Sequence, residues 1–282
     1  MKNRLLITSF VLASFLFCAA HSFSSSIPEP RIISLAPSTT EILFALGLDD
    51  EIVGVSSFCD YPPKALTKEK VGTFSQPNVE KILSLRPDII FCTGLEQAPV
   101  ITRLRQLNLK VYVSDPSNFV ELFNSIKEIG RLTDTEKEAD SLIEGMNKGM
   151  EEIISEAKSI PEGKKVKVFV EIWSSPLMTA GRGSFIGELI ALAGGINIAY
   201  DVKRPYSYFS PEQVLKHDPD CIILAYMDKK DPVKTAGERF GWSSIAAVKN
   251  NRVYNDISPD LFLRPGPRLV EGLKEIHERL YP

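Results

Sequence analysis

Cysteine and histidine are scarce in this chain, whose 282 residues include four cysteines and three histidines. Cys18 lies in an N-terminal apolar run, which leaves an odd number of cysteines in the rest of the chain. An odd number cannot form a complete disulfide framework, so stability is expected to come from hydrophobic cores. His217 and His277 stand far apart, and without clustered ligands a first-row metal site is poorly supplied.

Catalytic signatures are missing as well. The chain contains no HExxH, no GxSxG and no Walker A sequence, and beyond residues 1–26 it has no third histidine for a catalytic triad. Residues 181–187 look superficially like a dinucleotide loop, but the third glycine comes one residue too late for GxGxxG. We therefore expect a protein that is not an enzyme and that needs no cofactor.

Charge of one sign is not in excess. The 33 basic and 36 acidic residues give a net charge of −3, which offers no reason to expect nucleic acid as a partner. With 44% hydrophobic residues, the chain has the composition of a globular protein of one or two domains.

Long apolar runs are absent except for residues 5–20, which follow Lys2 and Arg4. This pattern is typical of a secretory signal and is too short to span a bilayer comfortably. Residues 1–26 are therefore predicted to be a signal peptide and tether, and the protein is expected to be exported to the periplasm or anchored in the envelope. Cys18 is a candidate for acylation, although Phe17 stands where a lipobox has a small residue.

One long helix is predicted over residues 133–160. Thr133 and Glu136 form a capping-box pattern at its start. Apolar residues then recur at helical spacing and form one stripe: Ala139, Leu142, Ile143, Met146, Met150, Ile153, Ile154 and Ala157. At 1.5 Å per residue this helix is roughly 40 Å long, enough to link two domains.

Strands alternate with helical patterns on both sides of this helix. In residues 27–132 strands are predicted at 31–35, 52–55, 89–91 and 111–113, and Ser38 with Glu41 suggests a capping box at the first helix. In residues 161–282 strands are predicted at 166–170, 221–224 and 252–254, with helices at 185–193 and 269–280. This alternation predicts an α/β fold of two lobes, each a mainly parallel sheet flanked by helices.

The two halves also resemble each other in sequence. Residues 80–91 align without gaps on residues 212–223, and each segment reads as a helix, a Pro-Asp turn and a buried strand. A weaker match pairs residues 41–47 with residues 188–194. Two equivalent lobes that face each other across a cleft are the simplest arrangement.

A known family shares several segments with this chain: 31–37 with Thr40-Glu41, 53–63, 78–82, 86–88, 210–214 and 264–268. From residue 31 to its end the chain resembles the substrate-binding proteins of ABC importers for cobalamin, ferric siderophores and haem, and above all the cobalamin-binding members. The resemblance implies a monomer that captures cobalamin between its lobes and delivers it to a two-fold symmetric permease with its ATPase.

Glu80 and Glu212 occupy equivalent sites in the repeat. Each is the second residue of a predicted helix, after Asn78 and Ser210 as N-caps. The helix macrodipole favours a carboxylate there in any protein, but it does not explain why both lobes present the same charge. The resemblance implies that these glutamates dock onto arginines of the permease, where charge pairs set orientation and encounter rate.

Aromatic residues near the predicted strand ends are the candidates for a ligand site. Flat aromatic faces suit a large macrocycle with an amide rim. The candidates are Phe58, Tyr61 and Phe74 in the first lobe and Trp173, Tyr206, Tyr208 and Phe262 in the second.

The resemblance adds Asp260, Leu261, Phe262, Leu263 and Arg264 to Phe58 as ligand contacts. The chain departs from the cobalamin-binding members by having Phe58 in place of a tyrosine and Phe74 and Thr93 in place of tryptophans.

Arg182 and Arg264 keep a second ligand open. In catecholate-siderophore binders, arginines neutralise an anionic iron complex, whereas in cobalamin a single phosphate is within reach of one arginine. Arg264 could also simply cap the turn before Pro265. Cobalamin is therefore the first expectation and a ferric siderophore the second, with haem and bare metal below both. Cys59 and Cys92 are expected as buried apolar filler, with a thiol approaching cobalt as the alternative.

Overall fold

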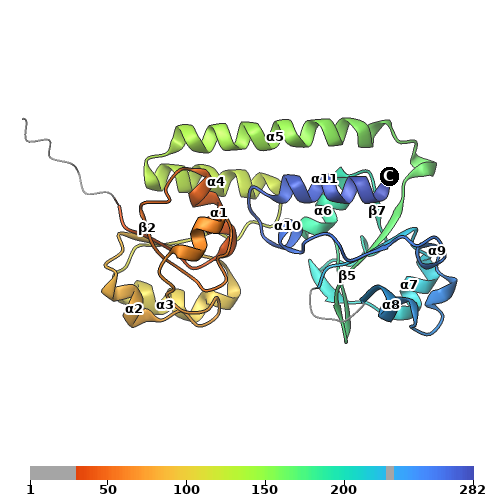
Figure 1. Cartoon of the computed structure of the whole chain (residues 1–282), viewed down its shortest axis with the longest axis horizontal. Helices are drawn as coiled ribbons and strands as arrows, with labels where there is room; N and C mark the ends of the chain where they lie inside the picture. Colours follow the sequence, from red (N-terminus) through yellow and green to blue (C-terminus); the bar gives the residue numbers. More distant parts are fainter. Residues whose placement is uncertain (1–29, 227–231) are drawn as a thin grey trace, which may run out of the picture.

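The computed structural model describes residues 30–226 and 232–282. Two α/β lobes lie beside each other along the long helix α5 (Glu136–Ser159), which spans both of them (Figure 1). The predicted signal and tether, with Cys18, lie outside the described residues. Within the described part of the chain, no helix combines the length and apolar character that a membrane crossing requires.

The first lobe contains a four-stranded parallel sheet in the order β2-β1-β3-β4. Its strands are β1 (Ile32–Ser34), β2 (Ile52–Val55), β3 (Ile89–Cys92) and β4 (Val111–Val113). Its helices are α1 (Pro37–Ala45), α2 (Val79–Ser84), α3 (Ala98–Gln106) and α4 (Phe119–Thr133), with the short 3-10 turns η1 (Pro63–Thr67) and η2 (Leu95–Gln97). The four predicted strands are confirmed.

The second lobe contains a mixed sheet in the order β10-β9-β5-β6-β8, and β7 also pairs with β5. Its strands are β5 (Lys167–Ser174), β6 (Leu177–Ala180), β7 (Ile196–Asn197), β8 (Tyr206–Tyr208), β9 (Cys221–Leu224) and β10 (Val253–Tyr254). The three predicted strands are present and run parallel, whereas β6 and β8 are antiparallel and were not predicted.

The helices of the second lobe lie on both sides of this sheet. They are α6 (Phe185–Leu192), α7 (Pro211–His217), α8 (Pro232–Gly237), α9 (Ala246–Lys249), α10 (Asp260–Leu263) and α11 (Leu269–Leu280), with the 3-10 turns η3 (Glu162–Lys164) and η4 (Trp242–Ser244). The predicted helices at 185–193 and 269–280 correspond to α6 and α11. The predicted limits of the lobes, 27–132 and 161–282, stay a prediction.

Both predicted capping boxes are wrong. Thr133 ends α4, where its hydroxyl donates to the carbonyl of Ile129 at 2.8 Å, and the chain passes through left-handed Asp134 (φ 56°) before α5 begins. Ser38 lies inside α1, which starts at Pro37 without a side-chain cap. Ser38 therefore lies two residues past the N-cap position of α1, and Thr133 still belongs to the preceding helix, two residues before the N-cap position of α5.

Helix α4 was not predicted from the sequence, although it carries a clear signal. The side chain of Asn118 accepts a hydrogen bond of 2.9 Å from the backbone N–H of Glu121, which is an N-cap. Phe119, Leu122 and Ile126 follow at helical spacing and are buried.

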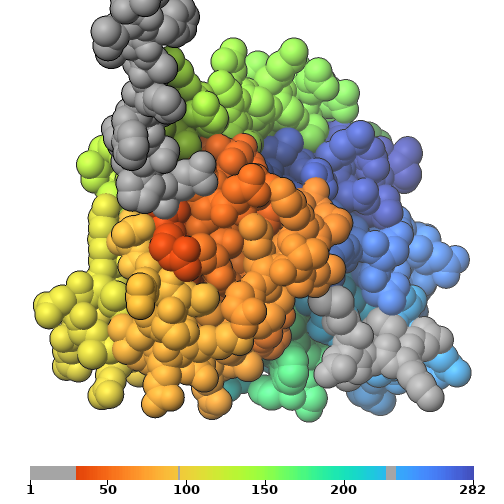
Figure 2. Space-filling model, turned by 60° about the vertical axis from the view of Figure 1, so that its left-hand side comes forward, coloured from red at the N-terminus to blue at the C-terminus, as the bar shows by residue number. Residues whose placement is uncertain are grey.

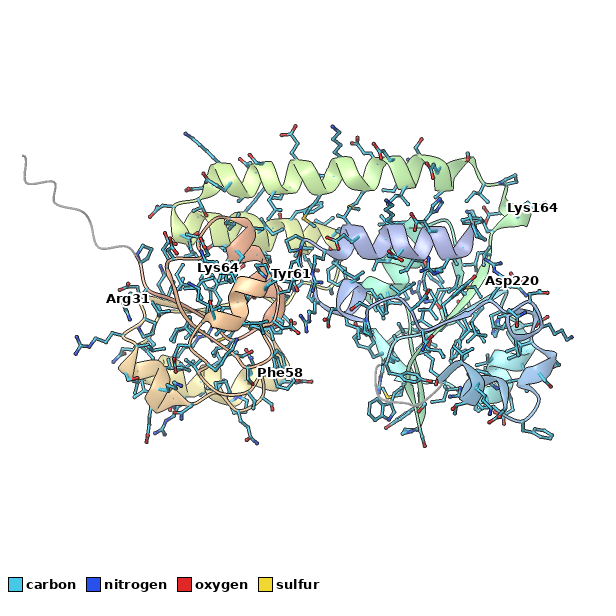
Figure 3. All side chains as sticks on the ribbon, in the orientation of Figure 1. Arg31, Phe58, Tyr61, Lys64, Lys164 and Asp220 are labelled. Carbon is cyan, nitrogen blue, oxygen red and sulfur yellow. The ribbon has the colours of Figure 1, made fainter. Side chains whose placement is uncertain are left out.

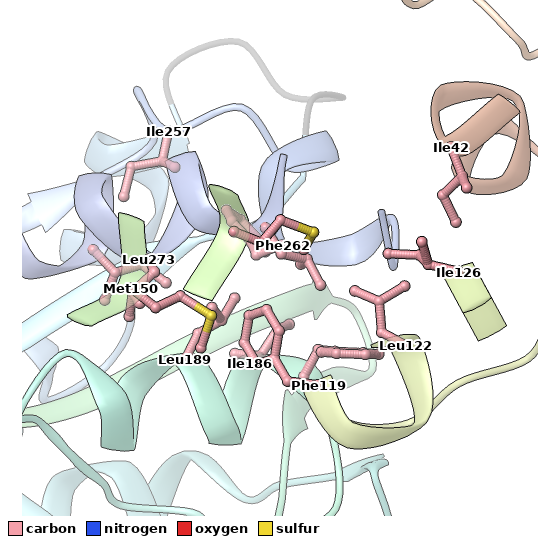
Figure 4. Packing of buried hydrophobic residues seen from close by; sticks show 14 of the residues in the cluster. Ile42, Phe119, Leu122, Ile126, Met150, Ile186, Leu189, Ile257, Phe262 and Leu273 are labelled. Atoms are coloured by element: carbon pink, nitrogen blue, oxygen red, sulfur yellow. The ribbon is translucent and has the colours of Figure 1, made fainter. Parts of the chain in front are cut away.

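The apolar stripe of α5 packs as predicted, because all but two of its residues are buried and those two are partly buried against the same core. This core is continuous across the lobes. Figure 4 shows Ile42 of α1, Phe119 of α4, Met150 of α5 and Phe262 of α10 within the same cluster. Burial of this surface, worth about 25 cal/mol per Å², holds the two lobes on the helix.

The predicted repeat extends to individual hydrogen bonds. Asp88 accepts from the backbone N–H of Arg31 at 2.8 Å, at the start of β1, and Asp220 accepts from that of Lys167 at 2.9 Å, at the start of β5. The residue two positions before each aspartate is left-handed, with φ 47° and 46°. The same helix–turn–strand unit is therefore built twice.

Candidate functional site

Glu80 and Glu212 lie at the starts of α2 and α7. Figure 1 shows both helices on the side of the molecule away from α5, one in each lobe. The predicted N-caps are confirmed, since Asn78 Oδ1 and Ser210 Oγ each accept from the backbone N–H three residues on, at 3.0 and 3.2 Å. Both glutamates are exposed to solvent.

The local field keeps Glu212 ionised. Its own backbone N–H and the Ser210 hydroxyl hold the pKa of the Glu212 carboxyl below its usual value. The partial positive charge of a helix N-terminus acts in the same direction. The two lobes therefore present carboxylates in the same local setting on one side of the molecule.

The first lobe presents exposed aromatic side chains in the loop that follows β2. Phe58 is 55% exposed and Tyr61 is 40% exposed. Figure 3 shows both at the edge of the first lobe nearest the second. Phe74 is partly buried, and the hydroxyl of Thr93 donates a hydrogen bond to Asp115 Oδ1 at 3.3 Å.

The second lobe presents its aromatic side chains from strands. Trp173 on β5 pairs with Met178 on β6, and Met178 pairs with Tyr208 on β8. Paired residues of antiparallel strands share a face, so Trp173 and Tyr208 form one row, and Tyr206, two residues from Tyr208, lies on the same face. The exposed fractions are 52% for Trp173, 71% for Tyr208 and 43% for Tyr206.

A β-bulge gives Trp173 this orientation. The register shifts between Glu171 and Trp173, so the two side chains, which would otherwise share a face, point to opposite sides of the sheet. Glu171 is fully buried and pairs with Arg239 Nη2 at 2.6 Å. No feature of the sequence marks this bulge. The sequence therefore did not predict that Trp173, Met178 and Tyr208 lie in one row.

The side chains of the segment 260–264 differ widely in their exposure to solvent. Phe262 is 1% exposed in the hydrophobic core, and Leu261 is partly buried against that core. Leu263 is 40% exposed, and Asp260 is half-buried. The expectation that Phe262 faces the ligand is therefore corrected, because its side chain is buried in the core instead of facing solvent.

The two predicted arginines differ in what they contact. Arg264 Nη1 lies 2.5 Å from Asp60 Oδ1 and its Nε lies 2.9 Å from Asp260 Oδ1, so its charge is already compensated. It does not simply cap the turn before Pro265. Arg182 is exposed, and its guanidinium carbon lies 5.1 Å from the centroid of the Tyr200 ring.

The described cysteines are buried, as expected for apolar filler. The hydroxyl of Thr40 donates to Cys59 Sγ at 3.1 Å, and burial raises the pKa of Cys92 to about 12, which keeps it a thiol. Among the residues described, no group of three or more His, Cys, Asp or Glu side chains is arranged to hold a metal ion.

Comparisons with known proteins agree on the family. The model of the family described as "Periplasmic binding protein" matches residues 32–258. An uncharacterized ABC transporter substrate-binding lipoprotein, YvrC of Bacillus subtilis, is 38% identical over 90% of this chain and 81% of its own length. The vitamin B12-binding protein of Vibrio cholerae is 29% identical over 96% of both chains.

A solved structure supports the same fold. A possible iron-binding (periplasmic solute-binding) protein from Staphylococcus epidermidis superposes with a TM-score of 0.79 at 33% identity, covering 89% of this chain and 98% of the other.

Proposed function

Because this chain belongs to the periplasmic binding protein family, and is an ABC transporter substrate-binding protein of the vitamin B12, haem and siderophore type, we propose that its ligand is cobalamin or a related corrinoid. The ligand is captured between the lobes and handed to a two-fold symmetric permease with its ATPase. The observation that carries this proposal is that both lobes expose aromatic side chains, the row Trp173–Tyr208 in the second lobe and Phe58 with Tyr61 in the first.

Aromatic rings suit a corrin ring because they supply large apolar contact area at low conformational cost. The first-lobe contacts are Phe58, Tyr61 and Phe74, and the second-lobe contacts are Trp173, Tyr206, Tyr208 and Leu263. Asp260 supports the site through its pair with Arg264. Arg182 is the charged group suited to the single phosphate of cobalamin.

A ferric catecholate siderophore is the alternative ligand. Its trianionic complex calls for several uncompensated cations. Since Arg264 is paired with Asp60 and Asp260, Arg182 alone of the two predicted arginines has no carboxylate among its described contacts. This count favours the corrinoid over the siderophore.

Glu80 and Glu212 are proposed as the two contacts with the permease. A permease with two-fold symmetry offers the same binding site twice, and the two glutamates match this with one carboxylate in each lobe. The protein acts as an exported monomer without turnover, held in the periplasm or, through Cys18, on the envelope.

Tryptophan fluorescence tests the ligand directly, because the chain has two tryptophans and they differ in exposure. Trp173 is 52% exposed and Trp242 is fully buried. Cyanocobalamin is expected to quench the emission of the wild type with saturation, and W173F should lose most of that quenching. Calorimetric titration with cyanocobalamin and with ferric enterobactin ranks the two ligands. Heat and quenching with the ferric catecholate only would replace cobalamin by the siderophore.

A further inference from the structure

Two glutamates at matching positions of the weaker repeat, Glu41 and Glu188, form contacts with the other lobe. Glu41 lies in α1 and Glu188 lies in α6, and both helices are followed by a left-handed glycine, Gly47 (φ 78°) and Gly194 (φ 84°). Each carboxylate contacts an element that belongs to the other half of the fold.

Glu41 binds the segment between α10 and α11. It is 4% exposed, and its two oxygens accept from Arg268 Nε at 2.9 Å and from Arg268 Nη2 at 2.7 Å, a bidentate pair. The ring of Tyr61 lies 3.9 Å from the guanidinium carbon of Arg268. Arg264 completes the cluster by pairing with Asp60 at 2.5 Å.

This cluster joins the lobes at the N-terminal end of α11. Glu41, Asp60 and Tyr61 come from the first lobe, whereas Arg264 and Arg268 lead into α11, which packs on α5 and α6. In Figure 2 the blue C-terminal part of the chain lies directly against the orange first lobe. The motifs Thr40-Glu41 and 264–268, which the sequence singled out separately, therefore bind each other.

Glu188 makes the corresponding contact in the opposite direction. Its Oε2 accepts from the backbone N–H of Phe119, the first residue of α4, at 3.1 Å. The ring of Phe119 also meets that of Phe185 edge to face, with centroids 5.8 Å apart. Glu188 is half-buried, so this single hydrogen bond is a weaker version of the bidentate pair at Glu41.

We propose that Glu41 and Glu188 are paired struts between the lobes, and that Glu41 with Arg264 and Arg268 positions the turn at Asp60 and Tyr61. That turn follows Phe58 and carries the aromatic surface of the first lobe. The struts fix the angle between the lobes and hence the width of the ligand site. The positioning role rests on the proposed function, whereas the strut role does not.

The angle between the lobes can be measured without any ligand. Spin labels on R103C in α3 and K216C in α7 report the separation of the lobes at their ends away from α5 (Figure 1), in a full-length chain that carries C18S. Both sites are exposed, and the remaining cysteines are buried and escape labelling. Double electron–electron resonance then gives the distribution of distances between the two spin labels.

Two variants break the main strut. R268M removes the charge and keeps the apolar stem, and E41Q/R268M also removes the buried carboxylate, so that no uncompensated charge remains to prevent folding. D60N, at a half-exposed residue, removes only the Asp60 partner of Arg264, which keeps its pair with Asp260. The matched control is R279M, because Arg279 lies in α11, the helix that follows Arg268. It pairs with Asp256 at 2.9 Å and lies over the Tyr254 ring, all within the second lobe.

R268M and E41Q/R268M are expected to broaden the distance distribution, and R279M should keep that of the wild type. E188A should broaden it less, and E188Q, which retains an acceptor oxygen, should leave it unchanged. Distributions equal to the wild type in R268M, E41Q/R268M and E188A would overturn the proposal, as would equal broadening in R279M.

The positioning role is read from cyanocobalamin titrations of the same proteins. If R268M leaves only about a tenth of the molecules with the wild-type angle between the lobes, the apparent affinity should fall roughly tenfold, in proportion to that fraction. R268K should not restore it, because an ammonium cannot make the bidentate pair. A wild type that binds no cyanocobalamin refutes the proposed ligand, while the distance distributions still decide on the struts.

Discussion

Residues 80–91 and 212–223 fold into the same helix–turn–strand unit, whereas the exposed aromatic surfaces of the two lobes are built differently. The first lobe presents Phe58 and Tyr61 from a loop, and the second presents Trp173 and Tyr208 from strands β5 and β8. A repeated outer unit suits a partner with two-fold symmetry. Aromatic surfaces that differ between the lobes suit a ligand without two-fold symmetry.

The largest expected effect concerns the repeated unit. E80K or E212K should lower uptake in cells by roughly 10- to 100-fold, because a like charge facing an arginine costs several kcal/mol. Ligand affinity should not change. The control is E138K, which alters an exposed glutamate in the first turn of α5, on the other side of the molecule. Equal uptake in E212K and E138K would show that Glu212 does not dock onto the permease, and the repeated unit would then need another explanation.

A comparable effect is expected at the exposed aromatic surfaces of the two lobes. W173A should weaken cyanocobalamin binding by about 1.5–3 kcal/mol, the value of burying one large apolar side chain, and F58A by a similar or smaller amount. F240A is the control, because Phe240 is 98% exposed and lies outside the aromatic row. Calorimetric titration gives each affinity. A full loss in W173A with none in F58A would mean that one lobe binds alone.

The two turn aspartates test how equal the repeated units are. D88A and D220A each remove a hydrogen bond to the first strand of a lobe, and each should lower the free energy of unfolding by about 0.5–1.5 kcal/mol. D220A should cost more, because Asp220 is half-buried and Asp88 is exposed. Urea unfolding measures both. If only one variant had a lower free energy of unfolding, the two hydrogen bonds would share a geometry but not an energetic contribution.

The smallest effect is a pH dependence at the contact between the lobes. Hydrogen bonding to Arg264 holds the pKa of the Asp60 carboxyl below its ordinary value of 3.8, with a further contribution from Arg268. Its stabilising effect is therefore complete above the unfolded pKa and is lost as the pH falls through the folded one. D60N should lower stability by about 0.5–1 kcal/mol at pH 7, given the exposure of the pair, and the difference in Tm should shrink toward pH 3. A constant difference would argue against an ionic origin.

Local signals predicted much of the outer architecture. The parallel strands, the apolar stripe of α5 and the caps at Asn78 and Ser210 follow from periodicity and capping chemistry, which act between neighbouring residues. The same reasoning failed at Ser38 and Thr133, where a capping pattern lay inside a helix.

The candidate site was less predictable. The chemical types of its residues were visible, but the exposure of Trp173 depends on a bulge, and the exclusion of Phe262 depends on the packing of α10 against α6 and α11. Both are set by neighbours that are distant in the chain, so no local pattern reveals them.

The sequence by itself determined the α/β alternation, the long connecting helix and the duplicated glutamates, because each depends on side chains within a few residues of one another. Only the tertiary structure decided that Arg264 neutralises Asp60 and that Arg268 binds Glu41, a partner 227 positions away. An arginine has the same appearance in a sequence whether its charge is free or compensated. The partner that compensates it is chosen by how the lobes pack.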